Sequence, residues 1–194
     1  HFSTFAVVHE YSKKFNDVNL GSWYYEAINT ALKEKWFSGV SDTEFQPDET
    51  MTRAMLVTVL YNLSESNSTK TRTNFADVDA NAWYAKAVAW AAENKIVEGY
   101  DGLFHPNDPV TRQQMASILY RYDLWAGNVP SVHGNLTKFT DADSVAAWAK
   151  NAMIWATDAG LIRGVGDGTL MPNGNATRAQ VAVILKNYYA QRAD

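Results

Sequence analysis

The chain has 194 residues, a formal net charge of −4 and no cysteine, and 46% of its residues are hydrophobic. This length and composition allow a substantial core, and 13% aromatic residues with seven tryptophans exclude a disordered protein. The acidic balance excludes a broad basic surface, so nucleic acid is not expected as a partner. The lack of cysteine excludes thiol catalysis, cysteine-based zinc sites and disulfides together.

The start of the chain gives little structural information. No stretch approaches the roughly 18 apolar residues of a membrane span, so no membrane partner is expected. His1-Phe2-Ser3 does not begin a signal peptide, and we interpret the chain as a piece processed or excised from a longer protein. Residues 4–14 have an ambiguous apolar pattern that is compatible with an N-terminal helix.

From residue 15 onward, one series of landmarks occurs three times. Its first phenylalanine recurs after 60 and then 64 residues, at Phe15, Phe75 and Phe139. We divide the chain into units 15–63, 75–125 and 139–190. A unit of this size is marginally stable alone, so we expect one compact monomeric body with internal pseudo-threefold symmetry.

Each unit opens with the pattern Phe-x-Asp. The aspartates are Asp17, Asp77 and Asp141. Aspartate in a loop most simply bonds nearby backbone amides and anchors the loop. That structural role is favoured by the residues alone, and a ligand-facing role is the alternative.

An amphipathic helix follows the aspartate in each unit. In the second unit Trp83, Tyr84, Ala87, Val88 and Ala91 form its apolar stripe, and the preceding asparagine at position 81 is available as its cap. Equivalent stripes begin at Trp23 and Trp148. Because a tryptophan on such a stripe is more often buried than exposed to ligand, the pattern favours core positions for all three tryptophans.

A turn ends this helix and leads to the next one. The glycines Gly39, Gly99, Gly160 and Gly164 suit a left-handed helix cap, and Tyr100-Asp101-Gly102 predicts a tight reversal. Pro47, Pro106 and Pro172 then predict an extended approach to a threonine five residues downstream.

The threonine starts a second helix in each unit. The motifs are Thr52-Arg53-Ala54-Met55, Thr111-Arg112-Gln113-Gln114 and Thr177-Arg178-Ala179-Gln180. Each threonine is expected to cap the helix, and Gln114 and Gln180 complete a capping box that Met55 cannot form. The apolar stripes of these three helices are able to converge on one axis.

The arginine of the motif breaks a local rule. The first position of a helix lies at the positive end of its dipole, where a cation is disfavoured. Arg53, Arg112 and Arg178 therefore either form salt bridges to an aspartate of a neighbouring unit or, together with free helix amides, bind an anion from outside.

Other chemical signals are weak. The segment 77–81 resembles the start of a calcium loop but lacks the required glycine and glutamate. His9, His105 and His133 have no zinc-site spacing, and no nucleophile motif or phosphate loop is present. We therefore expect no metal, no cofactor and no catalysis.

In their order and threefold recurrence these landmarks resemble the S-layer homology domain, by which bacterial surface proteins attach to wall polysaccharide. The resemblance covers residues 15–188 and is best in the second unit. It implies an all-α, pseudo-threefold assembly around a central three-helix bundle, located outside the cell at the wall or S-layer. The implied partner is secondary cell wall polysaccharide, an anionic polymer of pyruvylated N-acetylmannosamine.

The resemblance also assigns site residues by motif position. It implies that the arginines bind the ligand carboxylate and that the aspartates and tryptophans form the grooves between units. The candidate ligand-binding residues are Arg53, Arg112 and Arg178; Asp17, Asp77 and Asp141; Trp23, Trp83 and Trp148; and the turn glycines Gly39, Gly99 and Gly164.

Two departures from the family pattern bear on function. The fourth motif residue, usually glutamate in the family, is Met55, Gln114 or Gln180 here, which favours an anionic ligand beside the arginines. The third unit has Ala142 and Ala149 in place of the usual valine and tyrosine, so its groove is expected to be altered or silent. A protein-binding module and a glycan-cleaving enzyme remain the alternative functions.

Overall fold

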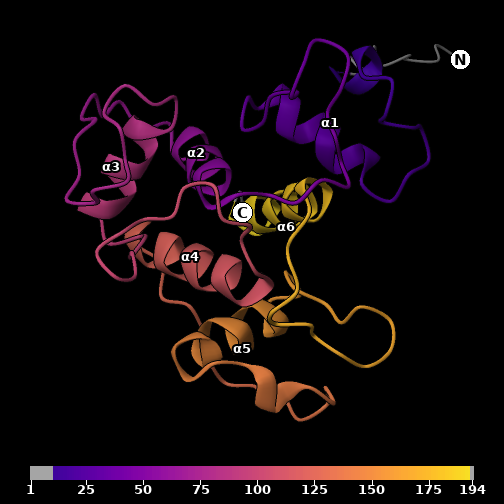
Figure 1. The fold of residues 1–194 in the computed structure, drawn as a ribbon. Coiled ribbons are helices and arrows are strands. Elements are labelled where there is room, and N and C mark those ends of the chain that lie inside the picture. Colours follow the sequence, from indigo (N-terminus) through magenta and orange to yellow (C-terminus); the bar gives the residue numbers. More distant parts are fainter. Residues whose placement is uncertain (1–10, 193–194) are drawn as a thin grey trace, which may run out of the picture.

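The computed structural model describes residues 11–192 (Figure 1). Within this range the chain forms six α-helices and three short 3₁₀ helices, without a strand, so the all-α class is confirmed. The α-helices are α1 (Tyr25–Lys33), α2 (Arg53–Leu63), α3 (Ala85–Glu93), α4 (Arg112–Trp125), α5 (Lys150–Asp158) and α6 (Arg178–Ala190). The 3₁₀ helices are η1 (Tyr11–Lys14), η2 (Ala142–Ser144) and η3 (Ala147–Ala149). The remainder of the possible helix over residues 4–14 lies outside the described residues.

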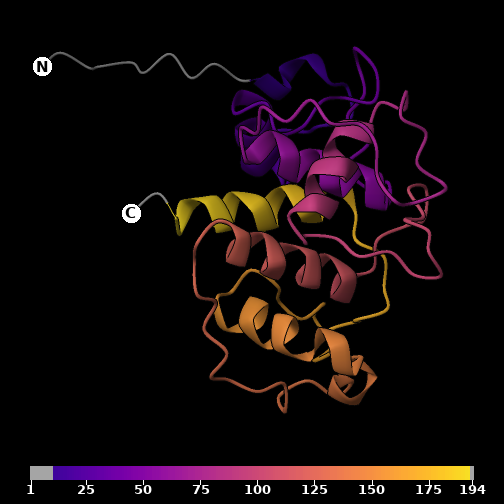
Figure 2. The ribbon, with the colours of Figure 1, turned by 90° about the vertical axis from the view of Figure 1, so that its left-hand side faces the viewer.

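The helices are arranged in two sets. Helices α2, α4 and α6 lie toward the centre, and α1, α3 and α5 lie outside them (Figure 1). The main helix contacts join α2 to α3, α4 to α5 and α6 to α1. Seen from the side, α6, α4 and α5 follow one another as layers (Figure 2). Each central helix thus packs on the outer helix of the next unit, and the last unit returns to the first.

Three backbone hydrogen bonds close the same ring at the centre. The Met51 N–H donates to Ala176 O at 2.9 Å, Ala176 N–H to Val110 O at 2.9 Å, and Val110 N–H to Met51 O at 2.8 Å. All three residues are completely buried. Because a buried amide without a partner is costly, this closed set favours the assembly of all three units together.

The buried side chains of the three units form one continuous core that extends from Phe15 to Tyr188. None of the helices in residues 11–192 is long and apolar enough to cross a membrane.

The central helices begin where the sequence predicts. The hydroxyl oxygens of Thr52, Thr111 and Thr177 accept hydrogen bonds from the amides three residues later. Gln114 and Gln180 complete capping boxes, whereas Met55 leaves α2 with the threonine bond alone. The helix starts and the difference between the three caps are confirmed.

The outer helices begin later than their apolar stripes indicate. Helix α3 starts at Ala85, and Tyr84 holds the cap position without a side-chain bond. The prediction that Asn81 caps it was wrong, because the Asn81 N–H donates to the Asp79 carboxylate within the preceding turn at 2.8 Å. Trp83 consequently lies in that turn and not on the helix.

The left-handed residues after the outer helices are mostly not the predicted glycines. They are Lys35, Lys95 and Gly160, with φ values of 59°, 57° and 67°. The prediction of a left-handed cap holds for Gly160 but was wrong for Gly39, Gly99 and Gly164, which do not have positive φ.

Close packing explains these other three glycines. A Cβ on Gly39 would lie 2.3 Å from the Phe15 ring, and one on Gly99 would lie 2.6 Å from the Phe75 ring. At Gly164 the corresponding distance to the Phe139 ring is 3.1 Å. The glycines therefore make room for the phenylalanine that opens each unit.

The predicted extended approach is confirmed for its last residues and was wrong at the prolines, which form turns. Isolated β-bridges join Thr50 to Thr177, Thr52 to Pro109 and Thr111 to Asn175, and the three capping threonines have extended backbone. Gln46, His105 and Met171, which precede the prolines, have φ values of 57°, 58° and 49°. Their carbonyls accept the amides of Glu49, Asp108 and Gly174 across each turn. The predicted reversal at Tyr100-Asp101-Gly102 is confirmed by reciprocal backbone hydrogen bonds between Tyr100 and Leu103, each 3.0 Å long.

Candidate functional site

The aspartate of each unit anchors a loop by accepting backbone amides, as its residue type predicts. The amides are not nearby, however, because they lie before the proline, 27 to 30 residues along the chain. Asp77 accepts the Phe104 and His105 amides at 2.8 and 2.7 Å. Burial alone would raise the pKa of Asp77, but these amide hydrogen bonds outweigh it and lower the pKa below its usual value. Asp17 holds the amides of residues 45 and 46, and Asp141 those of residues 170 and 171.

The motif arginines are buried, with only 4% to 6% of their surface exposed. In each, Nε and Nη2 donate to two backbone carbonyls of the next unit in the ring. For Arg53 these are Phe104 O at 2.8 Å and Glu98 O at 3.0 Å. Arg112 donates to Leu170 O and Arg163 O, and Arg178 donates to Phe45 O and Ser38 O, at 2.7 to 2.8 Å.

Both simple expectations for these arginines require correction. Within residues 11–192 no ion pair joins a motif arginine to Asp17, Asp77 or Asp141. The link is indirect, because Asp77 holds the amide of Phe104 while Arg53 donates to the carbonyl of that same residue.

The helix amides beside the arginines are not free either. The Arg53 and Ala54 amides donate to Asp108 O and Pro106 O of the next unit, both at 3.0 Å. Equivalent bonds form at the start of α4 and α6. The turn of the neighbouring unit therefore occupies the position that we assigned to an external anion at the helix end.

The guanidinium groups keep their charge and some donor capacity. Burial lowers the pKa of Arg53 and Arg112, and it lowers the pKa of Arg178 to about 10, so all three remain protonated at neutral pH. A guanidinium has five N–H donors, and the two carbonyl bonds use two of them. Within the described chain Nη1 of each arginine has no hydrogen-bond partner, so a ligand oxygen can bind there.

Three grooves of matching composition surround these arginines. Each groove combines a motif arginine from one unit, the turn glycine and central helix of the next unit, and the tryptophan of the third. The Arg112 groove contains Gly164 and Trp23 and has a volume of about 700 Å³. The Arg178 groove contains Gly39 and Trp83, at about 440 Å³. The Arg53 groove contains Gly99 and Trp148, at about 180 Å³.

The structure therefore brings together three of the four kinds of candidate residue. The arginines, tryptophans and turn glycines line the grooves, whereas the aspartates lie behind them and fix the loops. The tryptophans are 59% to 65% exposed, so their predicted burial was wrong. Trp23 and Trp83 lie in the turn before the outer helix and Trp148 lies in η3, so none of them follows the helical stripe toward the core.

The groove tryptophans differ in whether the next residue packs against their ring. Trp23 and Trp83 each make an edge contact with the following tyrosine, Tyr24 or Tyr84, with ring centroids 5.3 and 5.2 Å apart. Trp148 is followed by Ala149 and lacks this contact. The tryptophan of the third unit is therefore the one without an adjacent tyrosine ring, and it lines the smallest groove.

Sequence reasoning missed several groove residues. One set immediately precedes the turn glycine and consists of Ser38, Glu98 and Arg163. Another lies on the central helices at matching positions and consists of Asn62, Arg121 and Asn187. In the Arg53 groove the two sets meet, because Arg121 Nη2 lies 2.8 Å from a Glu98 carboxylate oxygen. Variation in charge at one repeat position is the sequence signal that would have found them.

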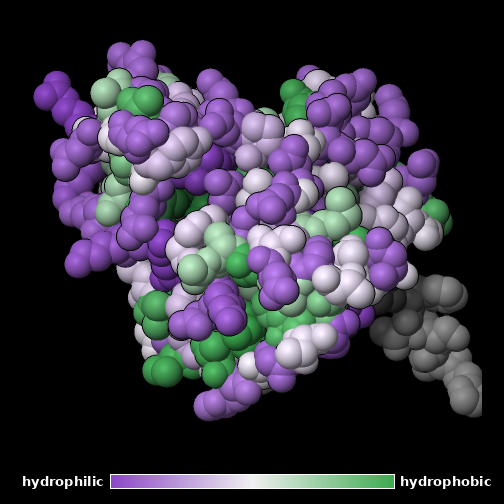
Figure 3. Space-filling view, turned by 60° about the horizontal axis from the view of Figure 1, so that its bottom comes forward, coloured by the Kyte–Doolittle hydropathy of each residue, from purple (hydrophilic) through white to green (hydrophobic). Residues whose placement is uncertain are grey.

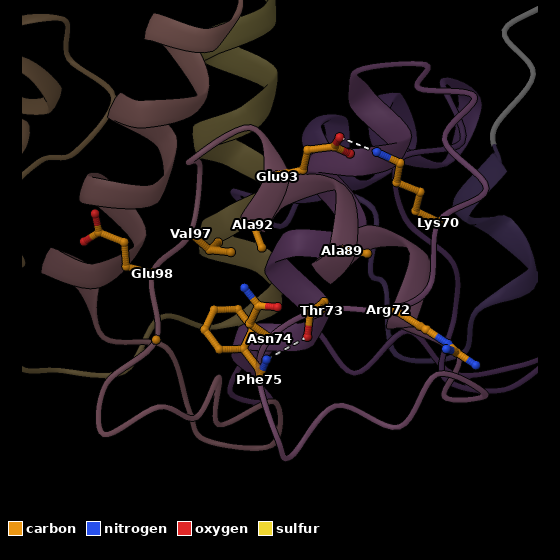
Figure 4. Close-up of a pocket in the computed structure, with 11 residues that line it drawn as sticks. Lys70, Arg72, Thr73, Asn74, Phe75, Ala89, Ala92, Glu93, Val97 and Glu98 are labelled. Atoms are coloured by element: carbon orange, nitrogen blue, oxygen red, sulfur yellow. Dashed lines mark hydrogen bonds and ion pairs between the residues drawn. The ribbon is translucent and has the colours of Figure 1, made fainter.

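A fourth cavity, which we call the linker pocket, lies between residues 70–75 and α3 (Figure 4). It has a volume of about 630 Å³ and shares Glu98 and Gly99 with the Arg53 groove. Lys70 and Glu93 form an ion pair across it, and Arg72 points away from that pair (Figure 4). Its two cations and two carboxylates balance, so its composition selects no class of ligand.

The histidines provide no metal site in the described residues. Across residues 11–192 no group of three histidine, cysteine, aspartate or glutamate side chains is placed to hold a metal ion. The His105 ring instead stacks on the Tyr100 ring, with centroids 3.8 Å apart. His9 lies outside the described residues.

The fold defines a class of protein, a module of three helical units joined in a ring with a groove beside each motif arginine. Comparison with known families then identifies it. The sequence model of the S-layer homology domain matches residues 14–54, 74–116 and 138–182. The chain therefore belongs to the S-layer homology domain family, which is found in bacterial cell-surface proteins.

Related proteins carry this module within much longer chains. An amylopullulanase from Thermoanaerobacterium thermosulfurigenes is 32% identical over 95% of this chain, which corresponds to 10% of that protein. The surface-layer 125 kDa protein of Lysinibacillus sphaericus is 35% identical over 88% of this chain and 14% of its own length. S-layer protein sap of Bacillus anthracis is 27% identical over 88% of this chain and 20% of its own length.

Proposed function

We propose that this chain is a non-catalytic anchor that holds a longer exported protein to the bacterial wall. Its ligand is secondary cell wall polysaccharide of the pyruvylated N-acetylmannosamine type, bound in the arginine grooves. The relatives support this role, because a surface-layer protein and an amylopullulanase share this portion of their chains and differ in name and length. A shared attachment module is the simplest function common to both.

The observation that carries the proposal is the pairing of a fixed cation with an exposed aromatic ring in every groove. Each guanidinium is held by two carbonyl bonds, so little side-chain entropy is lost when its remaining N–H groups bind a carboxylate. The exposed tryptophan presents a flat apolar face on which a sugar ring can stack. Together they suit an anionic sugar.

The first experiment is a calorimetric titration of the chain with purified wall polysaccharide. The titration is repeated after mild acid has removed the pyruvate ketal. We expect binding that disappears with the ketal, because the guanidinium then has no carboxylate partner. Binding that persists would move specificity to the sugar ring and the tryptophans. No binding to either polymer would contradict the proposal.

The tryptophans allow a test that leaves the buried arginine bonds intact. Trp23→Ala and Trp83→Ala are each expected to weaken binding by roughly two- to tenfold, the worth of about 0.5–1.5 kcal/mol of ring stacking. Trp125→Ala is the matched control, since Trp125 is also partly exposed but does not line a groove. Equal binding by all three variants would remove the stacking role.

A protein-binding surface is the second candidate. Leu124 and Val129, at the end of α4 and just beyond it, are 47% and 91% exposed. Apolar side chains also gather on the lower part of the face shown in Figure 3. A partner protein that binds in the absence of polysaccharide, with loss of binding in Leu124→Ser, would favour this candidate. Replacement of the groove tryptophans should then leave binding of the partner protein unchanged.

A further inference from the structure

One position of the repeat carries a different charge in each unit. The residue before the turn glycine is Ser38 in the first unit, Glu98 in the second and Arg163 in the third. All three residues line a groove, and their backbone carbonyls accept Nη2 of the motif arginine in the same way. The backbone is thus held constant while the side chain changes from neutral to acidic to basic.

In the Arg53 groove this position supplies an internal carboxylate. Glu98 pairs with Arg121, the groove-facing arginine on α4, at 2.8 Å. Both members stand at the surface, with 69% of the Glu98 side chain and 30% of the Arg121 side chain exposed. A ligand carboxylate that enters beside Arg53 meets like charge from Glu98 and must compete with it for Arg121. This groove also has the smallest volume of the three.

In the Arg112 groove the same position adds a cation. Arg163 joins Arg112 there, and the place of Arg121 is taken by the neutral Asn187. Among residues 11–192 no acidic residue lines this groove, which has the largest volume of the three, so no described lining residue neutralises the two arginines. The Arg178 groove has an intermediate volume and contains neither a second cation nor a carboxylate, because among the described residues Ser38 and Asn62 leave Arg178 as its one charged lining residue.

We propose that the residue before the turn glycine ranks the three grooves for an anionic glycan. Arg163 makes the Arg112 groove the strongest site, and Glu98 keeps the Arg53 groove weak by occupying Arg121 and repelling the ligand. The inference rests on the proposed function and makes it more specific, since it states which groove binds the anionic sugar most tightly and which side chains cause the difference.

The test uses substitutions toward the first unit, which carries serine at this position. Arg163→Ser should lower the affinity of the strongest site about fivefold, the usual upper limit for one exposed charge pair. Arg163→Glu should lower it further. Glu98→Ser should instead raise affinity at the Arg53 groove about fivefold and increase the number of sites detected at a given polysaccharide concentration. All of these differences should shrink at high salt.

Folding does not confound these variants, because the substituted side chains of Glu98 and Arg163 are exposed and the carbonyls that hold the motif arginines belong to the backbone. Lys86→Ser and Glu65→Ser are matched controls that remove one charge of each sign at exposed positions outside the grooves. They should bind polysaccharide as the unaltered chain does.

The outcomes separate the two proposals. If the unaltered chain binds wall polysaccharide but Arg163→Ser, Arg163→Glu and Glu98→Ser match it in affinity, stoichiometry and salt dependence, the ranking is overturned and the anchoring role stands. Stronger binding after Arg163→Ser would also overturn the ranking. If the unaltered chain binds no polysaccharide, the anchoring role and the ranking are both overturned.

Discussion

Each motif arginine joins two neighbouring units and also faces a groove. Arg53 fixes the second unit through the carbonyls of Phe104 and Glu98 while its Nη1 stays unpaired within the described chain. Arginine suits both tasks because its planar fork carries five donors, which a lysine ammonium cannot replace in the same geometry. Loss of binding in an alanine variant of these arginines would therefore not distinguish loss of ligand contact from loss of structure.

Asp77 gives a pH-dependent test at the residue scale. Its pKa in the folded chain lies below the usual 3.8, so its contribution to stability is complete above about pH 5 and is lost as pH falls through the folded pKa. Asp77→Asn should lower the free energy of unfolding by about 1–2 kcal/mol at pH 7, because the hydrogen bonds from Phe104 and His105 lose their charged acceptor.

Urea unfolding at pH 7 and pH 3 measures this effect. The difference in the free energy of unfolding between Asp77→Asn and the unaltered chain should be smaller at pH 3 than at pH 7. Asp79→Asn is a suitable control, since within the described residues the Asp79 carboxylate accepts hydrogen bonds from Asn81 alone, in an exposed turn. If that difference in the free energy of unfolding is the same at both pH values, the anchoring role of the Asp77 carboxylate is contradicted.

The turn glycines predict unequal effects of one substitution. In Gly99→Ala the added Cβ would lie 2.1 Å from Leu103 O and 2.6 Å from the Phe75 ring, so the backbone must move. In Gly164→Ala the nearest atoms are 3.0 and 3.1 Å away, and a small shift suffices. We expect Gly99→Ala to destabilise the chain by about 2 kcal/mol or more and Gly164→Ala by about 1 kcal/mol. Thermal unfolding followed by circular dichroism decides the order, and equal melting temperatures would contradict it.

At the scale of helices, the missing capping box of α2 offers a stabilising change. Thr52 caps α2 through the Met55 amide, but the methionine side chain cannot return a bond to the Thr52 amide. Met55→Gln would recreate the arrangement of Thr111 and Gln114 in α4. We expect a gain of about 0.5 kcal/mol in the free energy of unfolding.

Met55→Leu serves as the control for that change, because it keeps an apolar side chain of similar volume. Chemical denaturation of both variants measures the difference. A Met55→Gln variant no more stable than Met55→Leu would show that the Thr52 amide is already satisfied in another way.

The helices also show what the sequence determines locally and what it does not. The threonine caps and the capping boxes at Gln114 and Gln180 depend on residues three positions apart, and they were predictable. The partner of Asp77, the Phe104 amide, lies 27 residues away, and only the anchoring role of the aspartate was predictable. The arginine partners were not, because Arg178 donates to the carbonyl of Phe45, 133 residues away. Which unit lies beside which is a property of the closed ring.

The exposure of the tryptophans could not be predicted from the hydrophobic pattern either. An apolar stripe that includes Trp83 and Tyr84 predicts that both face the core, but α3 begins only at Ala85. In the turn before the helix, successive side chains no longer follow helical spacing, so Tyr84 packs inward while Trp83 is 65% exposed. A shift of two residues in the helix start therefore converts a core residue into a groove residue.

At the scale of the whole molecule, the ring makes every unit dependent on another. The principal helix pairs all join different units, so a unit taken alone lacks the partner of both its helices. In an open repeat array each unit contacts only its neighbours and stability accumulates along the chain. Here the contact between α6 and α1 and the hydrogen bond from Met51 to Ala176 return the third unit to the first.

This closure predicts strongly cooperative folding. A chain that ends at residue 126 would leave α4 without α5 and α1 without α6, and it would expose the buried faces of Ile28 and Leu119. The Met51 amide would also lose its acceptor at the centre. Since two units retain one of the three principal contacts between central and outer helices, we expect the shortened chain to show no cooperative thermal transition, whereas the intact chain unfolds in one step by both circular dichroism and tryptophan fluorescence. A shortened monomer with a sharp transition, or an intact chain whose two signals melt at different temperatures, would show that the units are stable independently and that the ring adds little to folding.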